Sequence, residues 1–141
     1  MDIAELRRKV LDAKDLSSKK VHVAEWDVDL WVRTLTGAER DKIETEWLKR
    51  RKLNGRADND TTDFRAFVAC WTVVDGSGKQ VFDTHSDVNA LTKKSGAALQ
   101  TIWNVAADLN RFTDKDVEEL AGNLETAPSG GSTSDSPSPL A

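Results

Sequence analysis

Apolar positions recur at helical spacing at the start of the chain. Four of them fall within a run that lacks glycine and proline: Ile3, Leu6, Val10 and Leu11. This spacing predicts a short amphipathic helix over residues 2–14. After two serines the pattern becomes an alternation of apolar and polar residues on both sides of residues 25–27. Such an alternation is typical of half-buried strands, so a β-hairpin is predicted over residues 21–32.

A capping box marks the start of the next helix. The Thr36 hydroxyl is placed to accept a hydrogen bond from the Glu39 amide, while the Glu39 carboxylate returns one to the Thr36 amide. The helix is predicted to reach about Leu53, because the Asn-Gly pair at residues 54–55 supplies a stop. Two apolar residues lie one turn apart on it and two charged ones have the spacing of an ion pair: Ile43 with Trp47, and Glu46 with Arg50.

The strongest helical periodicity follows a polar stretch at residues 59–62. Five large apolar residues carry it: Phe64, Phe67, Val68, Trp71 and Val74. The pattern predicts a core helix over residues 64–74, with its N-cap among residues 59–62. Residues 75–78 have the composition of a turn, and residues 79–82 suit only a brief extended segment.

Three further helices are predicted from serine and threonine caps. Ser86 precedes a short helix over residues 87–93, and Ser95 precedes a longer one with five apolar residues at helical spacing: Leu99, Ile102, Trp103, Ala106 and Leu109. Thr113, with Asp116 three residues later, is predicted to cap a last helix that carries three apolar residues: Val117, Leu120 and Leu124.

These elements predict an α+β fold, a mostly helical domain with an N-terminal β-hairpin. The domain is expected over residues 1–125. Residues 126–141 are rich in serine, proline and glycine and hold almost nothing to bury, so they are predicted to form a disordered C-terminal tail. A chain of 141 residues suits one such domain.

Charge and cysteine content narrow the class of protein. The net charge of −4 disfavours a protein whose whole surface binds nucleic acid, since phosphate contacts need a positive field. Cys70 is the only cysteine, so no internal disulfide forms, which fits a reducing compartment. No stretch is long and apolar enough for a membrane span. We therefore expect a cytoplasmic protein with no membrane partner.

Three segments hold residues that could carry chemistry, and each has a simpler interpretation. Residues 74–80 resemble a phosphate loop but lack its first glycine and its final serine or threonine, so a tight turn is favoured. His85 between Asp83 and Asp87 offers too few ligands for a metal, and a helix start explains them. Cys70 lies in an apolar run, where a thiol is usually inert. We predict no catalytic residue, no cofactor and no metal, and a protein that is not an enzyme.

The one basic run is Lys49-Arg50-Arg51-Lys52, followed by Arg56. A nucleic-acid contact is one interpretation of it. The other is that cations near a helix C-terminus complement the helix dipole, and the negative net charge favours this second interpretation.

Large side chains give the candidates for partner binding. If the second strand alternates as predicted, Trp31 faces away from its apolar neighbours, and Trp26 lies at the tip of the hairpin. Aromatic and arginine side chains anchor many interfaces. By side-chain type the candidate partner-binding residues are Trp26, Trp31, Arg33 and Trp47, although core packing is expected for at least one tryptophan of the hairpin.

In its order of motifs the chain resembles the tail assembly chaperones of siphophages, over roughly residues 6–125. Four segments carry the resemblance: VHVAEW (21–26), VRTLTGAERD (32–41), VDGSGKQVF (74–82) and ADLN (107–110). The resemblance implies a protein that binds the tape measure protein in the host cytoplasm, keeps it soluble and helps to recruit the major tail protein. It also implies absence from the finished virion, and a longer product made by ribosomal frameshifting in many members. Self-association is left open.

Two other functions compete with this one. A structural tail or neck component would stay in the virion. A small nucleic-acid-binding regulator would use the basic run at residues 49–56, and its affinity would fall steeply with salt. Apolar contacts with helical segments of a client, as in helix-in-groove recognition, are the mechanism expected of a chaperone.

Overall fold

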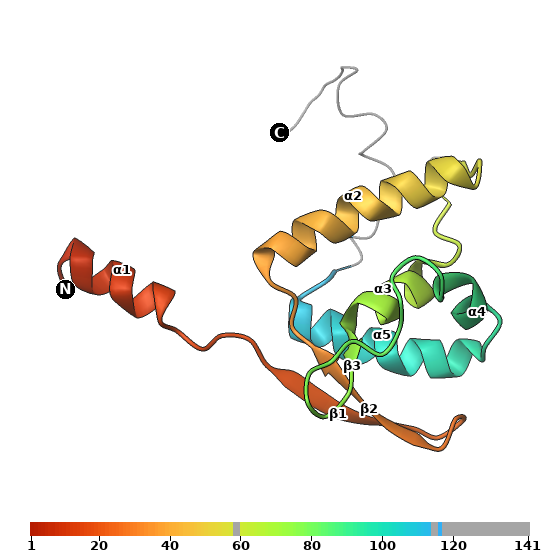
Figure 1. The fold of residues 1–141 in the computed structure, drawn as a ribbon, viewed down its shortest axis with the longest axis horizontal. Helices are drawn as coiled ribbons and strands as arrows, with labels where there is room; N and C mark the ends of the chain where they lie inside the picture. The colour runs from red at the N-terminus through yellow and green to blue at the C-terminus, as the bar shows by residue number, and fades with distance from the viewer. Residues whose placement is uncertain (58–59, 114–115, 117–141) are drawn as a thin grey trace.

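The computed structural model describes residues 1–57, 60–113 and 116, and shows helices packed on one face of a small sheet, with the N-terminal helix set apart from them (Figure 1). The elements in chain order are α1 (Ile3–Leu11), β1 (Ser18–Val23), β2 (Val28–Arg33), α2 (Gly37–Leu53), α3 (Phe64–Thr72), β3 (Val73–Val74), α4 (Val88–Thr92) and α5 (Gly96–Asn110). The sheet is antiparallel with the order β1-β2-β3. The predicted α+β class is thereby confirmed.

The hairpin of β1 and β2 has the alternation that the sequence predicts. Val21 and Val23 are buried on the face that α5 covers, while Lys20 and His22 are exposed on the other face. Val21 pairs with Leu30, which keeps the apolar residues of both strands on one side of the sheet. The turn places Asp27 at a φ of 50°, a conformation that aspartate tolerates better than most residues.

The predicted helix over residues 64–74 is wrong at its C-terminal end. Helix α3 stops at Thr72, and Val73 and Val74 pair as β3 with Val32 and Trp31. A short apolar run fits a buried strand as well as a helix, and two successive β-branched residues favour the strand once the edge of β2 is available. Both valines are buried, and Gln80 bridges to Val74 in the brief extended segment that was predicted.

Helix α2 begins as predicted. The Glu39 amide donates to the Thr36 hydroxyl at 3.1 Å, and the Thr36 amide donates to the Glu39 carboxylate at 2.9 Å. The helix ends at the predicted stop, where Gly55 has a φ of 61°. Three residues one turn apart face the body of the protein and are buried: Ile43, Trp47 and Arg51.

The core is built around aromatic rings from α2, α3 and α5. The Trp47 ring lies 5.0 Å from Phe64 and 5.2 Å from Phe67, both on α3. Phe64 in turn contacts Trp103 of α5, with the ring centroids 5.5 Å apart. Such tilted and edge-to-face pairs bury large apolar surfaces. They hold α2 over α3 and α5 (Figure 1).

Two predicted helix caps are corrected. The N-cap of α3 is Asp63, at a φ of 72° and without a side-chain cap bond, and not one of the residues 60–62; Asn59 lies outside the described residues. The short predicted helix is confirmed as α4, but its N-cap is Asp87, and Ser86 donates its amide to the Asp83 carboxylate. The Asp63 carboxylate pairs with Arg50 and Arg56, and the Asp87 carboxylate accepts from the Asp83 amide. Local cap preferences do not anticipate these contacts. Ser95 caps α5 as predicted.

Helix α1 stands apart from the rest of the fold. It projects away from the body on the segment 12–17, and none of its residues is buried (Figure 1). It begins two residues into the chain, where the Glu5 amide donates to the Asp2 carboxylate at 2.8 Å. The predicted amphipathic helix is therefore confirmed with slightly narrower bounds, but its apolar stripe is not buried against the part of the body that the structure describes.

The end of the chain is described only as far as Thr113 and Asp116. Their reciprocal bonds, from the Thr113 amide to the Asp116 carboxylate and from the Asp116 amide to the Thr113 hydroxyl, form the predicted cap. The remainder of the predicted last helix and the predicted tail over residues 126–141 lie outside the described residues. Among the described helices, none is long and apolar enough to cross a membrane.

Candidate functional site

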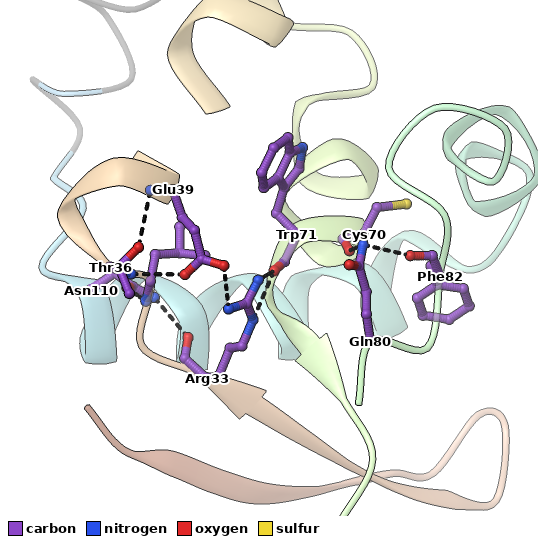
Figure 2. Close-up of polar contacts among 9 residues, drawn as sticks. Arg33, Thr36, Glu39, Cys70, Trp71, Gln80, Phe82 and Asn110 are labelled. Atoms are coloured by element: carbon purple, nitrogen blue, oxygen red, sulfur yellow. Dashed lines mark hydrogen bonds and ion pairs between the residues drawn. The ribbon is translucent and has the colours of Figure 1, made fainter. Parts of the chain in front are cut away.

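Two of the four segments that carry the sequence resemblance, residues 32–41 and 107–110, meet in one hydrogen-bond network, and a third, residues 74–82, bonds to the neighbouring carbonyl of α3 (Figure 2). At its centre is Arg33, at the end of β2. Its guanidinium donates to the Glu39 carboxylate at 2.7 Å and to the Trp71 carbonyl at 3.2 and 2.9 Å. One side chain therefore ties the sheet to the start of α2 and to the end of α3.

The C-terminus of α3 explains why this network exists. Because α3 passes directly into β3, its last carbonyls need partners from elsewhere in the chain. Arg33 supplies them for Trp71, and the Gln80 side-chain amide donates to the Cys70 carbonyl at 3.2 Å and to the Phe82 carbonyl at 2.8 Å. A cationic group at this end also complements the helix dipole.

Asn110 closes the other side of the network. Its side-chain oxygen accepts from the Leu35 amide at 2.7 Å, and its side-chain nitrogen donates to the carbonyls of Arg33 at 3.2 Å and Ala106 at 3.0 Å. Asn110 is buried, so these bonds offset the cost of removing a polar amide from water. It fixes the last turn of α5 against the connection between β2 and α2.

The ionisation of Glu39 belongs to the same network. Partial burial alone would raise its pKa, but the hydrogen bond from the Thr36 backbone and the hydrogen bond and charge of Arg33 together outweigh burial and lower the pKa. The carboxylate therefore stays charged well into the acid range and keeps both the helix cap and the ion pair.

The four candidate partner-binding residues are placed very differently. Trp47 has an exposed fraction of 0%, so its assignment to a contact surface is corrected: an indole on the inner face of α2 fills the core. The guanidinium of Arg33 is committed to contacts within the chain, as described above. Trp26 and Trp31 are half-buried and keep part of their rings accessible. A contact of these two with a partner stays a prediction.

Trp31 lies on the face of the sheet opposite the core, as its alternation predicts. The Lys20 ammonium sits 5.6 Å from the centre of its ring, and a Cβ at Gly76 would lie 3.4 Å from the edge of that ring. The turn at residues 75–78 therefore packs against the indole, and this contact restricts the orientation of the ring.

The basic run serves mainly to hold the loop between α2 and α3. Arg50 and Arg56 both pair with the Asp63 carboxylate, which is 8% exposed, and Arg51 is 2% exposed and donates to the Ala57 carbonyl. The predicted ion pair between Glu46 and Arg50 is wrong, since Glu46 pairs with Lys49 and His85. Burial of these guanidinium groups leaves little of the run for nucleic acid.

The segments weighed for chemistry have structural roles. In the turn at residues 75–78, the Asp75 carboxylate accepts from the amides of Ser77 and Lys79, so these donors are already used and do not face a phosphate. Burial raises the pKa of the Cys70 thiol to about 12, which makes it a poor nucleophile. Within the described ranges, no three His, Cys, Asp or Glu side chains are placed to hold a metal ion.

Helix α1 and the connecting segment 12–17 are together called the arm. The arm has an exposed apolar surface that side-chain type alone did not identify. Its members are Ile3, Leu6, Val10 and Leu11 of α1, exposed by 54 to 84%, and Leu16 of the connecting segment, exposed by 56%. We call the residues on α1 the α1 stripe. A signal was present in the sequence, because the mostly polar segment 12–19 separates this stripe from the alternating residues of the sheet.

Comparisons with known proteins give one structural similarity. No family model matches the chain, and no curated protein matches it. A solved structure described as "Structure of bacteriophage HK97 tail assembly chaperone" is similar over 79% of this chain and 100% of that chain, with 19% sequence identity and a TM-score of 0.49. At that identity and TM-score, the similarity assigns neither a family nor a function to the chain.

Proposed function

We propose that this protein is a phage tail assembly chaperone that binds the tape measure protein, keeps it soluble and helps to recruit the major tail protein. The identity of the client comes from the sequence resemblance. The observation that carries the proposal is the α1 stripe, an exposed apolar face on a helix that stands away from a closed core. We place the complex in the host cytoplasm and expect the protein to be absent from the virion.

The α1 stripe has the geometry of a helix-in-groove contact. Ile3, Leu6 and Val10 follow the i, i+3, i+7 spacing that presents apolar side chains along one side of a helix. Burying each such side chain contributes about 1.5–3 kcal/mol. A few of them, less the cost of ordering the partners, give a contact that forms and releases, which suits a chaperone that must hand over its client.

The connection to the body gives the stripe its reach. Six residues separate the end of α1 at Leu11 from the start of β1 at Ser18, and an extended chain of that length spans about 20 Å. The body remains a rigid base, because the Arg33 and Asn110 contacts fix the root of α2 and the end of α5. The arm therefore extends the reach of the α1 stripe beyond a body that these contacts hold fixed.

Co-expression with the product of the next long downstream reading frame tests the proposal. We expect that product to become soluble and to co-purify with this chain at both low and high salt, because an apolar contact is not screened. A client that stays insoluble, with no complex, contradicts the proposal. A complex lost at high salt favours an electrostatic contact and counts against the α1 stripe.

Mass spectrometry of purified virions distinguishes the chaperone proposal from a structural component of the virion. The chaperone proposal expects this chain to be absent, whereas a tail or neck component is present in stoichiometric amounts. The nucleic-acid regulator is disfavoured because Arg50, Arg51 and Arg56 are committed to Asp63 and Ala57. A longer product made by frameshifting stays a prediction.

A further inference from the structure

Charges on α1 are arranged around its apolar stripe. At 100° per residue, Arg7 falls within the stripe, while Arg8 and Lys9 border its two sides. Glu5 and Asp12 fall on the opposite side of the helix. The surface of α1 is thus an apolar stripe that includes one arginine and has a cation on each side, although the whole chain carries a net charge of −4.

The sequence of this chain contains a segment with the complementary pattern. Val117, Leu120 and Leu124 repeat the i, i+3, i+7 spacing of Ile3, Leu6 and Val10. In a helix, Glu118 and Glu119 would border the two sides of that stripe. The reciprocal bonds between Thr113 and Asp116 form a helix cap at the start of this segment.

The arm and this segment leave the body at the same place. Ser17, at the root of the arm, accepts from the Thr34 amide at 2.8 Å. Asn110, three residues before Thr113, binds the residues on either side of Thr34 through the Arg33 carbonyl and the Leu35 amide (Figure 2). The arm and the C-terminal segment therefore both leave the body beside residues 33–35.

A second contact keeps the exit of the C-terminal segment at this place. The Arg40 guanidinium lies 4.2 Å from the centre of the Phe112 ring and 3.8 Å from the Asp116 carboxylate. Arg40 belongs to the first turn of α2, close to Thr34 in sequence. Two segments tethered so close together meet at an effective concentration on the order of millimolar.

We propose that residues 117–124 dock on the α1 stripe of the same chain, apolar side to apolar side, with their carboxylates beside Arg8 and Lys9. This contact concerns the surface named in the proposed function, and it would cover that surface until a client displaces it. The docking itself does not rest on the identity of the client. A second copy of the chain is the competing occupant.

Disulfide cross-linking in the full-length chain tests the contact. With Leu6→Cys and Leu120→Cys, we expect a disulfide within one chain under mild oxidation, at a rate independent of protein concentration. The matched control is Glu5→Cys with Leu120→Cys, which places the thiol on the opposite side of the same exposed helix and should react severalfold more slowly. Cys70 stays in place, because it is buried in the core.

Charge reversal tests the borders of the stripe. Arg8→Glu with Lys9→Glu should slow the cross-link severalfold, and adding Glu118→Lys with Glu119→Lys should recover most of the rate. Equal rates for the Leu6 and Glu5 pairs overturn the proposal, and so does a disulfide that forms only between chains, which assigns the stripe to a second copy. Solubilisation of the client is measured separately, so either proposal can fail without the other.

Discussion

The backbone amide of Leu35 donates a hydrogen bond of 2.7 Å to the side chain of Asn110, 75 residues further along the chain. This contact joins the connection between β2 and α2 to the last turn of α5. Because Asn110 also binds the carbonyls of Arg33 and Ala106, three backbone groups depend on one buried side chain. These bonds fix the body of the protein next to Ser17, where the arm begins.

Replacing Asn110 with alanine should lower the free energy of unfolding by about 1–3 kcal/mol, since the buried amide of Leu35 loses its partner. Urea denaturation of the purified variant measures this change. Asn104→Ala is the matched control, on an exposed face of the same helix, and should stay within about 0.5 kcal/mol of the parent. Equal losses for the two variants would remove the structural role given to Asn110.

The pH dependence of stability should report the lowered pKa of Glu39. A carboxyl whose pKa is lower in the folded state stabilises the fold above its unfolded pKa of about 4.3. That contribution is lost as the pH falls through the folded value. The free energy of unfolding of Glu39→Gln should therefore fall below the parent's at neutral pH and converge with it in acid. A constant difference across that range would contradict the pKa shift.

Replacing Asp63 should destabilise the fold in two ways, by removing its charge and by removing its tolerance of a positive φ. Asp63→Asn keeps a residue that accepts a positive φ but leaves Arg50 and Arg56 without their carboxylate, so a loss of about 3 kcal/mol is expected. Asp63→Ala should lose more, because alanine is strained at a φ of 72°. Thermal unfolding measures both. An asparagine variant as stable as the parent refutes the ion-pair argument.

Trp47 should affect stability and not client binding. Trp47→Ala removes the ring that contacts Phe64 and Phe67, and about 3–5 kcal/mol of unfolding free energy should be lost. Leu53→Ala, on the same helix but 87% exposed, should change little. Folded Trp47→Phe protein should bind the client as the parent does. Weaker binding by that variant, at full folded fraction, would return Trp47 to the contact surface.

The parts of the fold that could be predicted are those with local signals. The capping box of Thr36 and Glu39 fixes the start of α2, and the alternation at Val21 and Val23 gives the hairpin and its buried face. Two-residue strand β3 could not be predicted, because its conformation depends on the edge of β2, which lies far away in the sequence. The N-cap at Asp63 depends on ion pairs with two arginines that lie 7 and 13 residues away in the sequence, beyond the reach of local cap preferences.

The candidate site was less predictable than the fold. Side-chain type favoured Trp47, although a large aromatic ring on a helix is as useful to a core as to an interface. Whether the apolar residues of α1 pack on the body or face solvent is decided by the path of residues 12–17, which no local pattern specifies. The amphipathic pattern predicted the helix and said nothing about what covers it.

Solubility of the co-expressed tape measure protein, compared between two matched double variants, tests the central claim most directly. Leu6→Ser with Val10→Ser removes two exposed apolar residues of the α1 stripe, and Glu5→Ser with Asp12→Ser changes its opposite side. Since none of these residues is buried, both variants should fold as the parent does. The account predicts that the first variant leaves the client insoluble and the second keeps it soluble. Equal solubilisation by both variants would contradict it.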